Sequence, residues 1–597
     1  MKFKNIYFLF CLFFNPALSF SESQSSAIQW QSWSPKVFED AQKENKNVLL
    51  YLEAIWCHWC HVIDLETYTD HKVIATLHEG YIPVRVDQDS NPDLSNRYKD
   101  YGWPATIVFN SKAQELAKRS GYIPKEKMQA LLVGLRKNPT PIADDLIDNG
   151  DFTHSELSED TRQKLIANHY NSIDWAKGGL NISQKYLDAD VLDYALLKSF
   201  EESERDMKIL ELTLKSNLWL FDPAWGGVYQ YSTAGDWKNP HFEKIISTQA
   251  KNMRIYANAF ALTADHDYEK AANDVYRFVS DFLKSPEGAF YTSQDSDLVK
   301  GQHAKEYFGL NNIERRAKGI PAIDKNIYSR ENGLMIEALS NLYASNQDKK
   351  VLDAAISAAN FIINNRKLSN GGFKHGDQDV DGPYLGDSLY MGIGALGLYS
   401  VTGDRHWLRE AISAANFIQS KFIIFNGEKP LAGFVSTPEN VKAILPAVRI
   451  LRENIDATRF FNLLSYYSGK ASFKEVAKIG MSYLALEKIA LKTLSEPGIL
   501  LADYEITKVP LHVTIVGSKN DLVSQSLFAT AFSYPLAYKR VEWWDRAEGS
   551  MPNADVTYPA LEKPAAYVCT NKQCSLPLTT PETLRSKLDK FLKRKVQ

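Results

Sequence analysis

The chain has 597 residues, a formal net charge of −3 at pH 7 and 44% hydrophobic residues. The near-neutral charge argues against nucleic acid as a partner. The length is enough for about three or four domains with well-buried cores.

The first 19 residues are predicted to form an export signal that is cleaved from the mature protein. Lys2 and Lys4 precede a short apolar run at 6–14, and small residues at 17 and 19 form a cleavage site. The apolar run is too short to span a bilayer. A retained N-terminal anchor is the alternative. We therefore expect a periplasmic or secreted protein that loses Cys11 with the signal and does not contact a membrane after cleavage.

Residues 27–136 alternate strand and helix patterns, which is typical of a small α/β domain, here predicted at 20–137. The apolar run at 48–52 predicts a buried strand, and further strands are expected at 81–86 and 105–109. Helices are expected from the cysteine motif at 57–60, from Asp70 to His78, and from Pro124 onward. Polar residues and two prolines make 138–159 a predicted linker.

The segment Cys57-His58-Trp59-Cys60 follows the first strand and opens a helix. Unpaired N–H groups and the partial positive charge of the helix end favour the thiolate of Cys57, and a protonated His58 adds to this effect. Cys57 is expected to attack a disulfide, and Cys60, one turn later, to resolve the mixed disulfide. A zinc half-site and an inert disulfide are the alternatives, although the region has no second C-x-x-C at ligand spacing.

This segment resembles thioredoxin. Pro104 lies 44 positions after Cys60 and matches the proline that thioredoxins hold in the cis form beside their cysteines, where exposed backbone pairs with substrate. Tyr51 stands where thioredoxins carry a buried aspartate that transfers protons. Efficient general disulfide reductase activity is therefore not expected.

From 160 to 505 the pattern is helical and repetitive. The eight residues 355–362 recur letter for letter at 411–418, and a looser copy begins at Ala271. Each copy follows a helix and a polar turn, and each precedes a loop with glycine and an aromatic residue. Helical hairpins of this kind bury their apolar faces only by stacking. A closed (α/α) toroid is favoured over an open solenoid because closure removes exposed ends.

Residues 506–597 return to a mixed α/β pattern. Strands are expected at 511–516, 540–544 and 565–569, and helices at 521–532 and 581–591. Cys569 and Cys574 are separated by a polar, turn-compatible segment, so we expect them to form a local structural disulfide.

The whole chain resembles the spermatogenesis-associated protein 20-like family. The matching residues are Cys57 to His61, Val86-Asp87, Gly102-Trp103-Pro104, Gly226-Gly227, Pro240 to Lys244, Asn332 to Met335, and Tyr567-Val568-Cys569. The resemblance implies a thioredoxin-like domain joined to a six-hairpin, glycosidase-like toroid. The chain departs from the family in having Glu331 where a tryptophan is expected and a shorter stretch after Pro92.

The helical region carries a second candidate motif, Pro240-His241-Phe242-Glu243-Lys244, just before a predicted helix. His241 and Glu243 are candidates for an acid–base pair in a toroid pocket, and a resemblance to N-acylglucosamine 2-epimerases and hairpin-toroid glycosidases implies a sugar as ligand. The alternative is that His241 only braces the following helix. Other candidates for one rim of the toroid lie in or near the glycine loops: Asp295, Asp297, His375, Asp377 and Asp387.

Our leading hypothesis is an exported thiol–disulfide oxidoreductase or redox-linked protein that acts on protein thiols or disulfides. The toroid would serve as its substrate or partner platform. The alternatives are a carbohydrate-active enzyme and a non-catalytic binding protein, each with a structural thioredoxin-like domain. No cofactor and no metal ion are expected.

Overall fold

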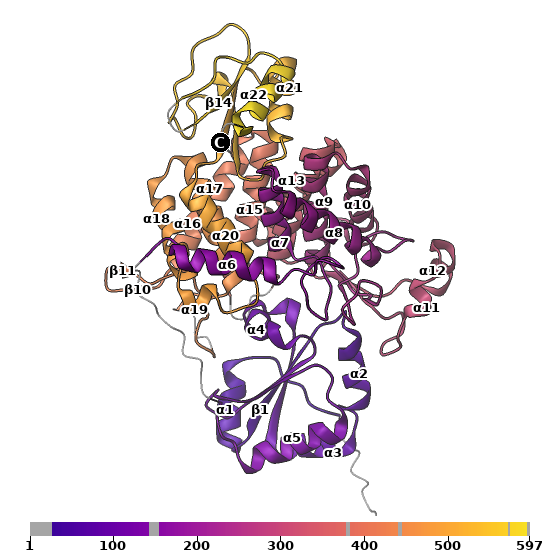
Figure 1. Cartoon of the computed structure of the whole chain (residues 1–597). Helices are drawn as coiled ribbons and strands as arrows, with labels where there is room; N and C mark the ends of the chain where they lie inside the picture. Colours follow the sequence, from indigo (N-terminus) through magenta and orange to yellow (C-terminus); the bar gives the residue numbers. More distant parts are fainter. Residues whose placement is uncertain (1–26, 143–153, 378–381, 440–443, 571–572, 594–597) are drawn as a thin grey trace, which may run out of the picture.

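The computed structural model describes residues 27–142, 154–377, 382–439, 444–570 and 573–593. The predicted export signal, with Cys11, lies outside the described residues, and so does the part of the predicted linker at 143–153. A thioredoxin-like domain, a ring of helices and a small C-terminal domain are stacked on one another (Figure 1). Among the helices that the structure describes, none has the length and apolarity to cross a bilayer.

The thioredoxin-like domain contains a four-stranded sheet in the order β2-β1-β3-β4. Strand β1 is parallel to β2 and antiparallel to β3, and its five central residues are fully buried because helices cover both faces of the sheet. The elements are β1 (Asn47–Glu53), β2 (Tyr81–Asp87), β3 (Ala105–Phe109), β4 (Glu115–Ser120), α1 (Pro35–Glu44), α2 (His58–Glu66), α3 (His71–Gly80), α4 (Pro92–Tyr98) and α5 (Lys125–Lys137). The predicted strands and helices are confirmed, whereas α1, α4 and β4 were not anticipated.

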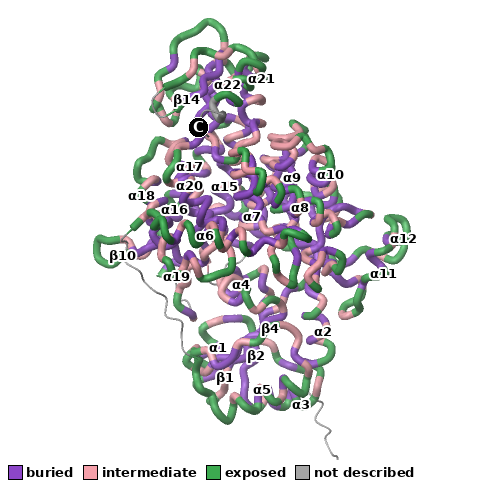
Figure 2. Tube along the Cα trace, in the orientation of Figure 1, coloured by how far each residue is buried: buried purple, intermediate pink, exposed green. Residues whose placement is uncertain are grey.

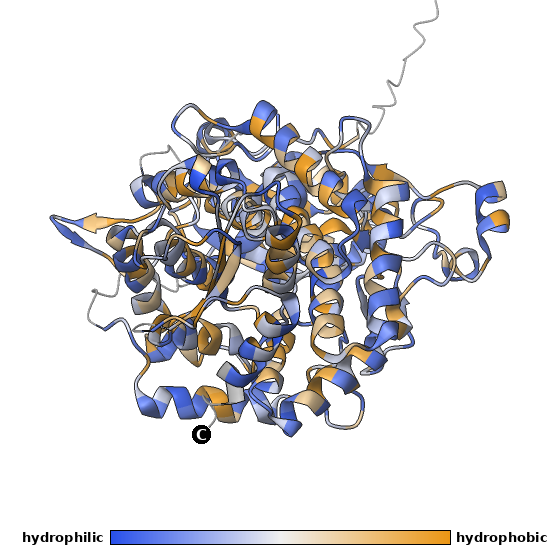
Figure 3. Ribbon diagram, turned by 90° about the horizontal axis from the view of Figure 1, so that it is seen from above, coloured by the Kyte–Doolittle hydropathy of each residue, from blue (hydrophilic) through white to orange (hydrophobic). Residues whose placement is uncertain are grey.

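The helical region is a closed ring, so the predicted toroid is confirmed. Six inner helices contact one another in chain order, and the last contacts the first: α7 (Ala189–Phe200), α9 (Ile246–Thr263), α13 (Ser329–Asn346), α15 (Leu385–Thr402), α17 (Leu451–Ser468) and α20 (Pro497–Thr507). The helices packed outside them are α6 (Glu159–Asn171), α8 (Glu204–Asn217), α10 (His266–Phe278), α14 (Lys349–Arg366), α16 (Arg405–Lys421) and α18 (Ala471–Leu484). The inner helix α15 is buried along most of its length (Figure 2), and the outer helices expose hydrophilic residues (Figure 3).

The repeated eight-residue segment packs in the same way in both of its copies. It lies on outer helices α14 and α16, where the alanines at its first, fourth and fifth positions are buried. A glycine loop approaches the serine of each copy: Gly288 lies against Ser357, and Gly371 lies against Ser413. Both glycines have φ +94° and leave no space for a Cβ atom, so the backbone conformation and the close contact each require glycine.

The remaining elements are short or belong to the C-terminal domain. The short ones are β5 (Tyr231–Ser232), β6 (Pro240–His241), β7 (Lys244–Ile245), β8 (Ser293–Gln294), β9 (Ile323–Asp324), β10 (Phe425–Asn426), β11 (Lys429–Pro430), α11 (Lys305–Phe308), α12 (Asn312–Lys318) and α19 (Glu487–Ala490). The C-terminal domain has a sheet in the order β13-β12-β14, formed by β12 (Leu511–Val516), β13 (Lys539–Trp544) and β14 (Ala565–Cys569), with helices α21 (Leu522–Phe532) and α22 (Pro581–Lys593).

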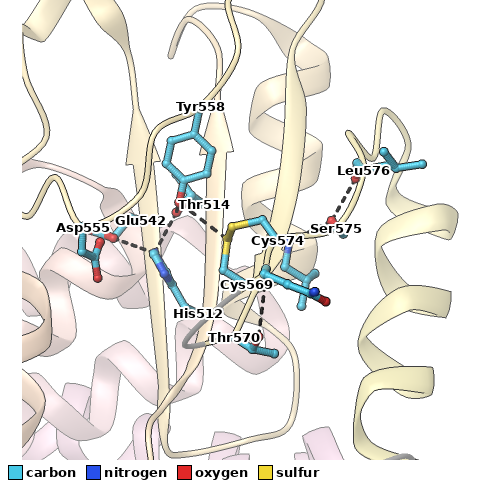
Figure 4. Close-up of a disulfide and its surroundings, with 12 residues drawn as sticks. His512, Thr514, Glu542, Asp555, Tyr558, Cys569, Thr570, Cys574, Ser575 and Leu576 are labelled. Carbon is cyan, nitrogen blue, oxygen red and sulfur yellow. Dashed lines mark hydrogen bonds and ion pairs between the residues drawn. A yellow bond between two sulfur atoms is a disulfide. The ribbon is translucent and has the colours of Figure 1, made fainter.

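A disulfide joins Cys569, at the end of β14, to Cys574 (Figure 4). The Cys569 sulfur lies 3.9 Å from the hydroxyl of Tyr558, which donates a hydrogen bond to Thr514. The disulfide therefore lies in the C-terminal domain, at the end of the molecule opposite the thioredoxin-like domain (Figure 1).

The two ends of the ring are covered by different domains. The N-terminal ends of the inner helices face the thioredoxin-like domain, whose α4 side chain Asn96 donates a hydrogen bond to Glu453 near the start of α17. At the other end, Phe200, Tyr343 and Val401, near the C-terminal ends of α7, α13 and α15, pack into the core of the C-terminal domain. The loops that carry the predicted rim residues thus lie against the thioredoxin-like domain.

We expect Gly333→Ala to destabilise the ring. A Cβ atom on Gly333, in α13, would lie 2.4 Å from the backbone carbon of Tyr390 in α15, and backbone cannot move away as a flexible side chain can. The expected loss is about 2 kcal/mol or more, measured as a lowered denaturation midpoint. The control is Gly134→Ala in the exposed helix α5, where a Cβ meets nothing within 4 Å and the change should stabilise by about 0.5 kcal/mol. An unchanged midpoint for Gly333→Ala would contradict the tight packing of α13 on α15.

Candidate active site

Cys57 lies immediately before helix α2 and caps its N-terminus. Its sulfur accepts a hydrogen bond from the backbone N–H of Cys60 at 3.3 Å and lies 3.6 Å from the carbonyl oxygen of Trp103. The Trp103–Pro104 peptide bond is cis, as the resemblance to thioredoxin implies. Both cysteines are free thiols and are buried, with 4% of Cys57 and 1% of Cys60 exposed. The motif thus has the backbone arrangement of a thiol–disulfide centre.

Cys60 is held as a neutral thiol. Burial raises its pKa well above the ordinary value, and its hydrogen bond with Cys57 acts in the same direction. Tyr51, which replaces the buried aspartate of thioredoxins, donates a hydrogen bond from its hydroxyl to the Cys60 carbonyl oxygen at 3.1 Å. Tyr51 therefore braces the first turn of α2, and its own pKa is raised by burial, so it does not supply a proton acceptor at neutral pH.

A carboxylate of the toroid joins both histidines of the cysteine motif. Asp297, in the loop after β8, lies 2.8 Å from Nδ1 of His58 and 2.9 Å from Nδ1 of His61. It also accepts a hydrogen bond from the backbone N–H of Gly301 at 2.9 Å. Burial opposes ionisation of Asp297, but the hydrogen bonds from the two histidines outweigh it and hold its pKa at about 2. These contacts fix the cysteine motif to the ring.

His61 is placed to be an imidazolium. Its Nδ1 faces Asp297, while its Nε2 lies 3.0 Å from the carbonyl oxygen of Ile55 and 3.6 Å from Asp295. Because both nitrogens face acceptors, both are best satisfied as donors. Burial opposes the charged form, but the hydrogen bond with Asp297 and the charge of Asp295 raise the pKa of His61 overall. His61, Asp295 and Asp297 could also supply one nitrogen and two carboxylate oxygens to a metal ion, since these atoms lie within 4.8 Å of one another.

The toroid covers the cysteines directly. Ile245, in β7, packs against Trp56, Cys57 and Cys60. The backbone N–H and the hydroxyl of Ser296 both donate to the Trp56 carbonyl oxygen at 3.3 Å. By contrast, Trp59 is 43% exposed. The motif is therefore covered on the side of the ring and accessible around Trp59.

His241 and Glu243 lie beside the cysteine motif rather than in the interior of the ring. Nδ1 of His241 is 4.0 Å from Glu243, and its ring stacks on Tyr231 with a centroid distance of 4.3 Å. Burial lowers the pKa of His241 to about 4, helped by the charge of His58. Burial raises the pKa of Glu243 to about 7. Burial thus favours the neutral form of His241, and Glu243 is the member of the pair that titrates near neutral pH.

His375, Asp377 and Asp387 are not brought together as one group. His375 is buried between Asp387, whose oxygen is 2.8 Å from Nδ1, and the Asp89 carbonyl oxygen, 2.7 Å from Nε2. Burial opposes the charged imidazole, but the Asp387 charge prevails and raises the pKa of His375 to about 9. Asp377 is exposed and pairs with Arg366. His375 thus tethers the ring to the thioredoxin-like domain, because Asp89 belongs to that domain.

A second carboxylate group lies at the same boundary. Asp87 is the last residue of β2, Asp89 follows two residues later, and Asp324 is in β9. Their oxygens lie within 4.8 Å of one another and could hold a metal ion. Trp56 donates a hydrogen bond from its indole to Asp89 at 2.7 Å. Burial raises the pKa of Asp89 to about 7, and burial also raises the pKa values of Asp87 and Asp324. Shared protons can therefore relieve the repulsion within this group.

A cavity of about 290 Å³ inside the ring holds residues that the sequence analysis missed. None of the candidates His241, Glu243, His375, Asp377 and Asp387 lines it. Its charged side chains come from the inner helices: Asp193, Lys251, Arg254, Arg330, Glu337, Arg452, Asp456, Arg459 and Glu505, together with Lys539 of β13. The sequence pattern that could have identified these residues is a set of charged side chains on one face of an otherwise buried helix, as at positions 452, 456 and 459 of α17.

Comparisons with known proteins support the sequence resemblance. A family model described as "Thioredox_DsbH: Protein of unknown function, DUF255" matches residues 16–143. Spermatogenesis-associated protein 20 from Homo sapiens is 25% identical over 319 residues, which are 47% of this chain and 40% of that protein. An uncharacterized protein from Caenorhabditis elegans is 20% identical over 95% of this chain and 96% of its own length. The predicted resemblance to the spermatogenesis-associated protein 20-like family is therefore confirmed, although the aligned region spans less than half of the human relative.

Two further similarities concern the separate parts of the chain. Thioredoxin X, chloroplastic, from Arabidopsis thaliana is 32% identical over 108 residues, 17% of this chain and 53% of that protein. Among solved structures, cellobiose 2-epimerase from Bacillus thermoamylovorans covers 54% of this chain and 85% of its own, with 13% identity and a TM-score of 0.43. D-mannose isomerase covers 59% of this chain and 98% of its own, with 13% identity and a TM-score of 0.43.

We expect Asp297→Asn to loosen the contact between the ring and the cysteine motif. The amide removes the negative charge that His58 and His61 share in a buried site, where loss of one partner costs about 3 kcal/mol. Opening of the interface should then speed alkylation of native Cys57 by iodoacetamide by about 100-fold. The control is Asp353→Asn, which removes an exposed i,i+4 pair with Lys349 and should leave the rate unchanged. Equal rates for Asp297→Asn and the unmodified protein would show that this carboxylate does not hold the interface.

Proposed function

We propose that this protein is an exported thiol–disulfide oxidoreductase whose redox centre is Cys57 and Cys60. The observation that carries the proposal is the position of the Cys57 sulfur at the N-terminus of α2, against the cis Trp103–Pro104 loop. Helix N-termini favour a thiolate. The confirmed thioredoxin-like fold supports the same chemistry.

The reaction follows from the two cysteines. The Cys57 thiolate attacks one sulfur of a substrate disulfide, forms a mixed disulfide and releases the first substrate thiolate. After Cys60 loses its proton, its sulfur attacks Cys57, forms the 57–60 disulfide and releases the second substrate thiolate. The substrate gains two electrons and the cysteine pair loses two. The same steps in reverse oxidise a dithiol.

The surroundings of the motif favour a partner that approaches along Trp59. Ile245 and Ser296 close the side of the motif that faces the ring. Trp59 and Tyr122 lie on the open side with ring centroids 5.9 Å apart. An extended segment of a protein that carries a thiol or disulfide fits this approach, because it presents one sulfur without a bulky body.

Glu243 and His241 have a supporting role in this proposal. They lie next to the motif, and the pKa of Glu243 is raised by burial to about 7. A carboxyl group that titrates near neutral pH can accept or return a proton during thiol exchange. Tyr51 cannot replace the aspartate of thioredoxins as a proton acceptor. Because Glu243 belongs to the ring, the ring would take part in the redox chemistry.

The second candidate function is carbohydrate chemistry in the ring, with the thioredoxin-like domain as a structural part. The cavity inside the inner helices favours it, because charged and polar side chains converge there. The predicted rim residues do not contribute to that cavity. More of the candidate side chains therefore support the redox proposal than support carbohydrate chemistry in the ring.

We expect Cys57 to react with iodoacetamide before Cys60 in the fully reduced protein at mildly acidic pH. Cys60 is nearly inaccessible, and burial raises its pKa. Peptide mapping of partly labelled protein should find Cys57 modified at least tenfold faster. In the control variants, Cys60→Ser should retain the rapidly alkylated cysteine, and Cys57→Ser should lose it. Preferential labelling of Cys60 would reverse the assigned roles.

Export is tested separately by the N-terminus of the mature protein. If residues 1–19 are a cleaved signal, protein recovered from the exported fraction should begin within a few residues of Phe20. N-terminal sequencing provides the measurement, and replacing the apolar run at 6–14 with polar residues provides a control that should stay inside the cell. A mature chain that still carries Lys2 and Lys4 would show that the signal is not removed.

A further inference from the structure

The cavity inside the ring is lined by residues of all six inner helices. Its volume of about 290 Å³ is close to the lower end of the range for small-molecule sites. Its lining runs from Arg330 and Arg452, near the helix ends that face the thioredoxin-like domain, to residues 532–539 of the C-terminal domain. The cavity is therefore separate from the cysteines and large enough for a ligand of sugar size.

Three ion pairs account for most of the charge in this cavity. Arg254 binds Asp193 through two hydrogen bonds of 2.8 and 2.7 Å. The Arg459 guanidinium binds Glu505 at 2.8 Å, and Arg452 Nε binds Asp456 at 2.8 Å. These paired groups form a rigid polar wall.

Lys251 has no such partner. The structure shows no hydrogen bond or ion pair between its ammonium group and any described residue, although it lies only one turn before Arg254 on α9. It is exposed to the space inside the ring. Its position among the inner helices removes part of its solvation, and this desolvation, together with the charges of Arg452 and Arg330, lowers the pKa of Lys251 to about 8. The amine is still mostly protonated at neutral pH, so an unsatisfied cation faces the cavity.

Arg330 adds a second binding group beside Lys251. One of its terminal nitrogens pairs with Glu331 at 2.9 Å, but its Nε is buried and has no hydrogen-bond partner among the described residues. A buried donor without an acceptor is costly. Both groups would be satisfied by an oxyanion, because carboxylates and phosphates accept several hydrogen bonds from Lys and Arg.

Glu337 offers a different contact farther along the cavity. It lies on α13 seven residues after Arg330, about 10 Å along the helix axis. Its carboxylate makes no hydrogen bond or ion pair with any residue that the structure describes, and the amide side chains of Asn258 and Asn341 also line this part of the cavity. Carboxylate and amide groups are suited to sugar hydroxyls, which both donate and accept.

We propose that the ring cavity binds a small, hydroxyl-bearing anion, with its carboxylate or phosphate group on Lys251 and Arg330 and its hydroxyl groups on Glu337. The ligand class is an acidic sugar or a sugar phosphate. Because Glu337 lies two helical turns from Arg330, the charged end of the ligand and its hydroxyl groups would occupy different parts of the cavity. This site is independent of the redox function proposed for Cys57 and Cys60.

Isothermal titration calorimetry of the full chain tests the site with four probes: D-glucuronate, glucose 6-phosphate, inorganic phosphate and D-glucose. We expect at least one of the two charged sugars to bind, and glucose to bind at least tenfold more weakly. Selective binding of glucuronate identifies a carboxylate ligand, whereas binding of glucose 6-phosphate and phosphate identifies a phosphate ligand. Failure of both charged sugars to bind, or equal binding of glucose, would overturn the proposal.

Matched variants locate the binding. Lys251→Met removes no contact made by the ammonium group, so the ring should still fold, and it should weaken the charged sugar at least tenfold. Lys251→Arg should restore most of the affinity. Lys208→Met, on the exposed face of outer helix α8, is the control and should leave affinity unchanged. Undiminished binding by Lys251→Met would place the ligand elsewhere and overturn the site.

Two further variants separate this proposal from the others. Glu337→Gln should weaken the charged sugar severalfold and leave inorganic phosphate, where it binds, unaffected. Cys57→Ser should retain full affinity, because the cysteines do not line the cavity. Loss of thiol exchange in Cys57→Ser together with normal sugar binding would support both functions as independent.

Discussion

The buried contact of Asp297 with His58 and His61 is the interaction on which the arrangement of the cysteine motif depends. A carboxylate whose side chain is 1% exposed must be matched by cations or hydrogen bonds, since an unpaired charge there is costly. The two histidines of the C-H-W-C-H motif provide that match from the first turn of α2. The motif is therefore part of the interface between the thioredoxin-like domain and the ring. This arrangement also explains why the motif is nearly inaccessible from the side of the ring.

The ring itself depends on close packing between its inner helices. Gly333 of α13 lies against the backbone of α15. A Cβ atom added to Gly394 of α15 would lie 2.9 Å from the carbonyl oxygen of Gly333. Such approach leaves little freedom for the helix axes to shift. Both ends of the ring are covered, one by α4 and the loops around the cysteine motif and the other by the C-terminal domain.

Much of this fold was predictable because local patterns report burial and turns directly. The apolar run at 48–52 became the central strand β1, and the copied segment on α14 and α16 revealed the hairpin repeat. Short elements with weak patterns, such as β4, were missed. The sequence also predicted that Asp297 and His375 lie at one rim of the toroid, but it could not show that they face another domain. That outcome depends on how the domains dock, which no local periodicity encodes.

The charges at the domain interface and those in the cavity differ in one physical respect. At the interface, Asp297 pairs with His61 and Asp387 pairs with His375, so these ion pairs are explained by the docking of the two domains. In the cavity, Lys251 and Glu337 face open space and have no partner among the described residues. Apolar side chains of similar size would fill the same positions at a lower desolvation cost. Docking therefore accounts for the first set of charges and not for the second, which is better explained by a ligand.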